Sequence, residues 1–134
     1  MYMKKVLIPL FASLVLMSAC KDDDHHHDDY HVDVVIAQPT EATEFNTGDM
    51  IQLRVNFSTD ATIHDIEVVI ENETTGEEVY HFDQHDHQPL LYELIDSVAL
   101  TVTDTTNFVL SASTWSHDTE DSPIIEERMF LVLP

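Results

Sequence analysis

The fold is decided by the stretch Ile51–Gln52–Leu53–Arg54–Val55–Asn56–Phe57, in which apolar and polar residues alternate strictly. Successive side chains of an extended strand point to opposite faces of a sheet, so this stretch predicts a strand with one buried and one solvated face. Similar stretches lie on both sides of it along the chain. They predict six more strands, at 32–39, 64–71, 79–82, 94–103, 108–115 and 124–133.

Seven short strands at this spacing, with no segment that predicts a helix of three turns, indicate an all-β domain. Turn-forming residues separate the strands, as at 45–49 and 72–77, and longer loops are expected at 83–89 and 116–123. The pattern is typical of a seven-stranded immunoglobulin- or fibronectin-like β-sandwich of about 100 residues, which we place at 32–134. A single cysteine excludes a disulfide framework, so the core of this sandwich must rest on packing alone.

The charge of the chain excludes one class of partner. The 134 residues include 26 acidic and five basic residues, giving a formal net charge of −21. A chain this acidic is repelled by a phosphate backbone, so no nucleic-acid partner is expected. A hydrophobic content of 43% equally excludes a fully disordered acidic chain.

The N-terminus has the pattern of a lipoprotein signal. Lys4 and Lys5 precede an apolar stretch at 6–17, which is too short to span a bilayer, and Ser18–Ala19–Cys20 follows. We predict a signal peptide at 1–19 and lipidation of Cys20, with the membrane as a partner through this anchor. The alternative is an ordinary secretory signal that has a cysteine there by chance.

Residues 20–31 are predicted to be a lipid-anchored, acidic and histidine-rich tether without stable structure. The segment is polar, low in complexity and lacks apolar periodicity. Lys21, Asp22 and Asp23, directly after the cysteine, resemble the export signal of surface lipoproteins in Bacteroidota. The expected location is therefore the outer membrane with the domain exposed at the cell surface, and the periplasmic face is the alternative.

The whole chain resembles the small Bacteroidota surface lipoproteins that carry one immunoglobulin-like domain with a histidine-rich loop. The resemblance rests on Cys20–Lys21–Asp22–Asp23, on the seven-strand pattern and on His81–Phe82–Asp83–Gln84–His85–Asp86–His87. It implies a location and a fold. It does not imply a particular chemistry.

Nine histidines are the residues on which an activity can be argued. In an antiparallel sandwich the strand directions place all nine at the end that carries the loop between the second and third strands. Imidazole is the commonest metal ligand, and nitrogen and oxygen ligands suit Zn²⁺ or Cu²⁺. The candidate metal ligands are His85, His87, His81, His64, His117 and Asp83. The alternative is a solvated polar surface.

No enzyme is expected, because the chain has no G-x-S-x-G turn, no H-E-x-x-H helix and no glycine-rich phosphate loop. Two functional hypotheses remain. In the first, the anchored domain binds zinc or copper through its clustered histidines. In the second, it is a non-catalytic module that presents loops or an edge strand to a protein or glycan partner.

Overall fold

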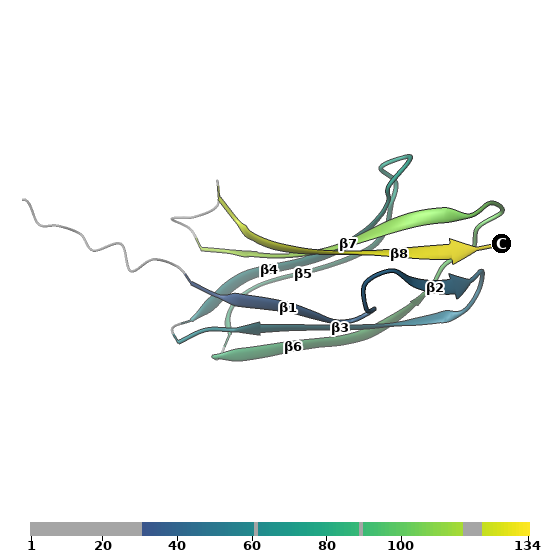
Figure 1. Cartoon of the computed structure of the whole chain (residues 1–134). Coiled ribbons are helices and arrows are strands. Elements are labelled where there is room, and N and C mark those ends of the chain that lie inside the picture. The colour runs from purple at the N-terminus through teal and green to yellow at the C-terminus, as the bar shows by residue number, and fades with distance from the viewer. Residues whose placement is uncertain (1–30, 61, 89, 117–121) are drawn as a thin grey trace, which may run out of the picture.

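The computed structural model describes residues 31–60, 62–88, 90–116 and 122–134, and of residues 86–88 it describes the backbone alone. These described ranges form eight strands in two sheets that pack face to face, which confirms the predicted β-sandwich (Figure 1). None of the described residues belongs to a helix long and apolar enough to cross a membrane. The predicted signal peptide and nearly all of the predicted tether lie outside the described residues.

The two sheets have three and five strands. The three-stranded sheet has the order β1 (Asp33–Gln38), β3 (Met50–Ser58), β6 (Leu91–Ala99). The five-stranded sheet has the order β2 (Thr43–Asn46), β8 (Ile124–Leu133), β7 (Thr106–Trp115), β4 (Ile63–Asn72), β5 (Glu78–Gln88). Every pair is antiparallel except β2 with β8, which is parallel.

The core lies between the sheets and follows the predicted alternation. The inward residues of β3, from Ile51 to Phe57, are at most 1% exposed. They face equally buried residues of the other sheet, among them Val68 on β4 and Leu110 on β7. Phe130 on β8 stacks on Phe108 with ring centroids 5.7 Å apart. Packing of this kind holds the domain together without a covalent cross-link.

The structure adds one strand that the sequence pattern did not predict. Strand β2 overlaps the predicted turn at 45–49 and pairs with the last four residues of β8. Phe45 points inward and meets Phe130 edge to face, with ring centroids 5.8 Å apart. Four residues with a single large apolar side chain are too few to give a periodic signal. The described residues therefore form eight strands, one more than the sequence predicted.

The predicted histidine-rich loop is a strand. Residues 83–88 continue β5 in register with β4, and β6 then begins at Leu91 and ends at Ala99, earlier than the predicted 94–103. The polar composition of 83–89 suggested a loop. A strand at a sheet margin tolerates polar side chains on its solvated face, because its backbone groups are satisfied by the neighbouring strand.

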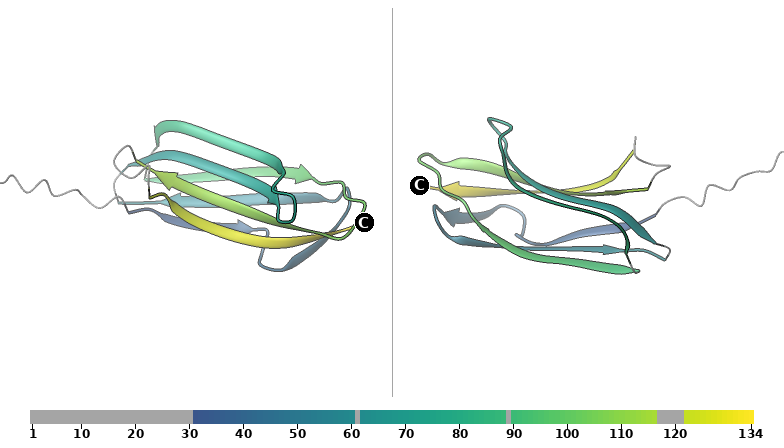
Figure 2. Two further views of the ribbon diagram at one scale, coloured as in Figure 1. Left: turned by 90° about the horizontal axis from the view of Figure 1, so that it is seen from above. Right: turned by 180° about the vertical axis from the view of Figure 1, so that it is seen from behind.

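The strand directions define two ends of the sandwich. At the first end Asp33 pairs with Ser58, Ile63 pairs with Gln88, and Thr114 pairs with Ile124. We call this the N-terminal end, because the described chain starts there at residue 31. The turn at 72–77 and the end of β8 lie at the opposite end, which we call the C-terminal end (Figures 1 and 2).

Candidate functional site

The register brings part of the candidate set to the N-terminal end. His64 follows the first residue of β4, and His85 lies opposite Asp65 near the end of β5. His31 lies there too, because its carbonyl accepts a hydrogen bond of 2.6 Å from the Thr59 hydroxyl. The backbone of His87 belongs to the same end of β5. The predicted residues that lie outside the described part of the chain are Cys20, Lys21, Asp22, Asp23, His117 and the tether histidines at 25–27.

His85 and Asp65 form a close pair across β5 and β4. The imidazole Nδ1 of His85 contacts the carboxylate Oδ1 of Asp65. The Asp65 side chain is 11% exposed, whereas the His85 ring is 73% exposed. On the other side of β4, the Thr114 hydroxyl donates a hydrogen bond of 2.7 Å to the Asp65 carbonyl. Asp65 is thus held in place, and its carboxylate orients the imidazole ring.

This arrangement has two chemical consequences. A buried carboxylate needs hydrogen-bond partners, and His85 supplies one. A histidine whose Nδ1 is directed to a carboxylate presents Nε2 on the far side of the ring, which is the common arrangement of metal-binding histidines.

His81 does not join His85. It lies opposite Val69, well along β4 toward the C-terminal end. His81 and His85 are four positions apart on an extended strand, which corresponds to about 13 Å. The His81 Nε2 is 3.3 Å from Glu67 Oε1, and its Nδ1 is 3.2 Å from Glu78 Oε1. The expectation that His81 lies with the other histidines is therefore wrong. The reason is that residues 83–88, predicted as a loop, continue the strand that contains His81, so the chain does not fold back and His81 stays well below the N-terminal end.

Asp83 lies between the two histidines and pairs with Glu67. It shares the outward face of β5 with His81 and His85, because the three are alternate residues without a register shift between them. Within the described residues, no group of three or more histidine, cysteine or acidic side chains is placed to hold a metal ion.

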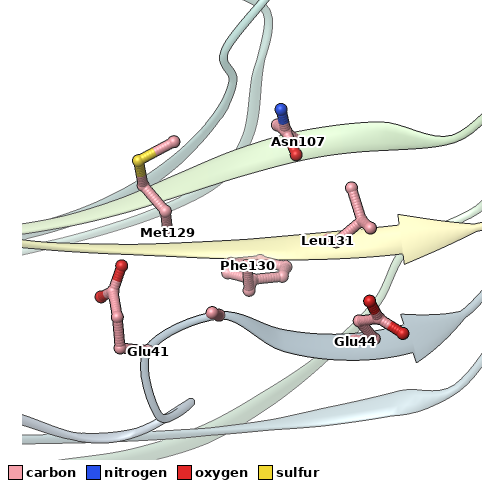
Figure 3. A pocket seen from close by; sticks show the side chains of 7 residues that line it. Glu41, Glu44, Asn107, Met129, Phe130 and Leu131 are labelled. Atoms are coloured by element: carbon pink, nitrogen blue, oxygen red, sulfur yellow. The ribbon is translucent and has the colours of Figure 1, made fainter.

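A recess beside β8 was not expected from the sequence. It has a volume of about 310 Å³ and lies where β2 runs parallel to β8 (Figure 3). Glu41 and Glu44 stand on one side of it and Met129 and Leu131 on the other. Glu41 is also paired with Arg128, whose Nη1 is 3.3 Å from the Glu41 Oε2. The recess depends on strand β2, which gave no periodic signal, so sequence reasoning had no means of finding it.

Side chains of β5 and β6 meet at one margin of the sandwich. The Tyr80 hydroxyl donates a hydrogen bond of 2.9 Å to Asp96 Oδ2, and the rings of Phe82 and Tyr92 stack with centroids 6.5 Å apart. Burial, reinforced by the Asp96 carboxylate, raises the pKa of the Tyr80 hydroxyl, and burial also raises the pKa of Tyr92. These contacts join the two sheets through side chains rather than through backbone hydrogen bonds.

Large apolar side chains are exposed on the outer faces of both sheets. On the three-stranded sheet, Val35 is 51% exposed, Leu91 61% and Ile95 65%. On the five-stranded sheet, Ile125 is 53% exposed and Met129 40%.

No protein-family model matches the chain, and no curated protein matches its sequence. Solved structures similar to the chain include the following two. The periplasmic chaperone SfaE is 15% identical, with a TM-score of 0.49, and the match covers 78% of this chain and 58% of the chaperone. The fibronectin(III)-like modules of CbhA from Clostridium thermocellum are 17% identical, with a TM-score of 0.47, covering 75% of this chain and 96% of the modules. The chain thus spans less than two thirds of the chaperone.

Proposed function

We propose that this protein is a lipid-anchored, non-catalytic interaction module that binds a partner through the outer face of its three-stranded sheet. The observation that carries the proposal is the exposure of Val35, Leu91 and Ile95 on that face, each of them more than half exposed. Several large apolar side chains exposed on one sheet face favour a binding surface more than a single exposed one does. Glu93 lies between Leu91 and Ile95 on this face, so the surface combines apolar and charged groups. Val35, Leu91 and Ile95 all belong to the rows of side chains on β1 and β6 that flank the solvated side of β3.

Site-specific photo-cross-linking in cells that display the full-length chain tests this proposal. A benzophenone amino acid replaces Ile95 in one variant and Ile125, an exposed isoleucine of the other sheet, in the control. We expect a discrete adduct with position 95 and none with position 125. Mass spectrometry of the adduct then separates a protein partner from a glycan. No adduct at either position, or the same adduct at both, would contradict the proposal.

The proposed anchor is Cys20, eleven positions before the first described residue, His31. Support comes from the Ser18–Ala19–Cys20 sequence. We expect Cys20→Ala to abolish labelling with a radioactive fatty acid and to move the protein out of the membrane fraction. Undiminished labelling would contradict the anchor.

Surface exposure is proposed from Lys21, Asp22 and Asp23. Replacing the three with alanine leaves Cys20 in place, so the variant remains lipidated. We expect that it is no longer digested by protease added outside the cells. A variant that is digested like the unaltered protein would contradict the export signal and favour another determinant of location.

A second candidate function is binding of Zn²⁺ or Cu²⁺ at the N-terminal end. The observation that favours it is the His85–Asp65 pair, which orients an exposed imidazole from a buried carboxylate. The proposed additional ligands come from His87, His64, His117 and Asp83. His81 is left out of this set because it contacts Glu67 and Glu78 elsewhere on β5.

The metal hypothesis is tested by thermal unfolding with and without each ion, because an ion that binds only the folded state raises the melting temperature. We expect the double variant His85→Ala with His87→Ala to lose the rise. His81→Ala, a histidine of the same strand, serves as the control and retains it. A rise that survives in the double variant would place the ion elsewhere, for example on the tether histidines.

A further inference from the structure

The described residues contain four sheet-edge strands, and they differ in how far they could accept another strand. The edges are β1 and β6 in the three-stranded sheet and β2 and β5 in the five-stranded sheet. Edge strands expose unpaired backbone N–H and C=O groups, and proteins usually interrupt them with bulges, charges, prolines or short lengths.

Three of these edges carry such interruptions. Strand β1 has a register shift between Ile36 and Gln38 and is followed by Pro39. Strand β2 is four residues long. Strand β5 has two register shifts, and its outward face carries His81, Asp83 and His85.

Strand β6 has no register shift and no proline, and its two charged residues already have partners within the domain: Glu93 contacts Arg54, and Asp96 accepts the Tyr80 hydroxyl. It pairs with β3 over nine consecutive residue pairs, from Met50–Ala99 to Ser58–Leu91, without a register shift. Figures 1 and 2 place it at the margin of the three-stranded layer. Alternate residues of such an edge direct their N–H and C=O groups away from the partner strand. The edge of β6 is therefore long, regular and suited to strand addition.

The side chains of β6 favour an occupant with an apolar face. Leu91 and Ile95 point outward from β6, and Leu90 just before the strand is 57% exposed. An added strand places alternate side chains about 4.5–5.5 Å from these residues. Its apolar side chains would contact Leu91 and Ile95. Within the described residues β6 has a neighbouring strand, β3, on one side only.

The charge of the domain favours a basic occupant over a second copy. Residues 31–134 contain two arginines and no lysine against 21 acidic residues. Both arginines contact carboxylates: Arg54 Nε is 2.6 Å from Glu93 Oε1, and Arg128 contacts Glu41. Two copies of this domain repel each other, whereas a lysine- or arginine-bearing segment is attracted to it.

From the regular edge, the exposed aliphatic side chains and the charge together, we infer that β6 binds an extended, basic segment of a partner protein as an additional strand. The inference rests on the proposed function and deepens it, because it names the edge that is used, the mode of binding and the chemistry of the partner.

The test uses a fluorescent peptide of alternating lysine and valine residues and the full-length chain in detergent micelles, with binding measured by fluorescence anisotropy. The key variant is Ile95→Lys, which places a positive charge beside the edge. Ile125→Lys is the matched control, since it changes the same residue type and the same charge on the other sheet. We expect Ile95→Lys to weaken binding by about tenfold or more and Ile125→Lys by less than about threefold.

Two further peptides separate strand addition from simple charge attraction. A peptide in which alternate backbone nitrogens are methylated keeps the charge but loses N–H donors, and we expect it to bind about tenfold more weakly or worse. A glutamate–valine peptide is expected not to bind. Equal binding of the methylated peptide, or equal effects of the two lysine variants, would overturn strand addition at β6. Equal binding of the acidic peptide would overturn the basic partner.

Sedimentation of the chain without peptide tests whether a second copy of the chain pairs with β6. A dimer that Ile95→Lys dissociates would show that β6 pairs with a second copy and would overturn the inference. The cross-linking experiment at position 95 tests the proposed interaction module separately from strand addition. An adduct at position 95 with a partner that the basic peptide does not displace would leave the interaction module intact and overturn only the strand addition.

Discussion

Asp65 and His85 occupy facing positions on β4 and β5 but opposite environments, the carboxylate nearly buried and the imidazole largely in solvent. Asp65 therefore depends more on its hydrogen-bond partner than His85 does. If the histidine is removed, a buried acceptor loses a partner. If the aspartate is removed, the imidazole remains accessible to water. This inequality gives a test of whether the pair stabilises the fold.

His85→Ala should lower the free energy of unfolding by about 1–3 kcal/mol, because it removes a partner from a buried charged group. The same substitution made together with Asp65→Asn should cost less, since a neutral amide is less costly to leave buried. Urea denaturation of the two single variants and the double variant measures the coupling. His81→Ala, whose contacts with Glu67 and Glu78 lie at the surface, is expected to cost less than about 1 kcal/mol. Equal costs of His85→Ala in both backgrounds would contradict the coupling.

Tyr80 predicts a loss of stability in alkaline solution. Its pKa in the folded protein lies above the value of about 10 expected for an unfolded chain. The folded state therefore holds the proton more tightly, so this contribution is present below pH 10 and is lost as the pH rises further. Tyr80→Phe should cost about 0.5–1.5 kcal/mol at neutral pH through the lost hydrogen bond to Asp96.

Urea denaturation of both proteins between pH 8 and pH 11 checks this prediction. The difference in stability between the original chain and Tyr80→Phe should narrow as the pH passes 10. A difference that stays constant up to pH 11 would show that the Tyr80 hydroxyl does not stabilise the fold in this way.

The two faces of β3 predict very different costs for removing an apolar side chain. Leu53 is 1% exposed in the core, whereas Met50 on the same strand is 60% exposed. Leu53→Ala should lower the free energy of unfolding by about 2–5 kcal/mol through lost burial and the cavity left behind. Met50→Ala should change it by less than about 0.5 kcal/mol. Chemical denaturation measures the loss of stability in both variants. Similar losses would contradict the placement of Leu53 in the core and Met50 on the solvated face.

Replacing Gly76 should lower the stability of the fold through its backbone conformation alone. Its φ is +69°, and a Cβ built there meets no atom within 4 Å. Gly76→Ala should therefore cost about 1–2 kcal/mol, the penalty of a left-handed conformation for an ordinary residue. Gly76→Asn should cost less, since asparagine tolerates this conformation better. Thermal unfolding of the two variants compares them, and a larger loss with asparagine would contradict this account.

The alternation in Ile51–Phe57, together with six similar stretches at regular spacing, was sufficient to predict the sandwich, because a strand buried on one face has apolar residues at every second position. Strand β2 could not be predicted in this way, since its place beside β8 follows from pairing between distant segments. The loop predicted at 83–89 was wrong for a related reason. Its composition indicates exposure, and both a loop and the solvated face of an edge strand are exposed.

The candidate site was predictable in part. Strand directions alone indicated that His64 and His85 share one end of the domain. The partnership of His85 with Asp65 was not predictable, because it depends on a register that shifts between Ile63 and Asp65. The regular edge of β6 could not be predicted either, since the sequence indicates the strands but not their order in each sheet.

The chain enters the sandwich at one end and leaves it at the other. Strand β1 starts beside Ser58, and β8 ends beside Asn46, so residue 31 and Pro134 are separated by roughly the length of a ten-residue strand, about 33 Å. A force applied between these two points acts along the strands. The hydrogen bonds between strands run perpendicular to that direction, so they bear the load together instead of opening one after another. Tension along the chain would therefore meet the sandwich in shear, the direction in which paired strands resist separation best.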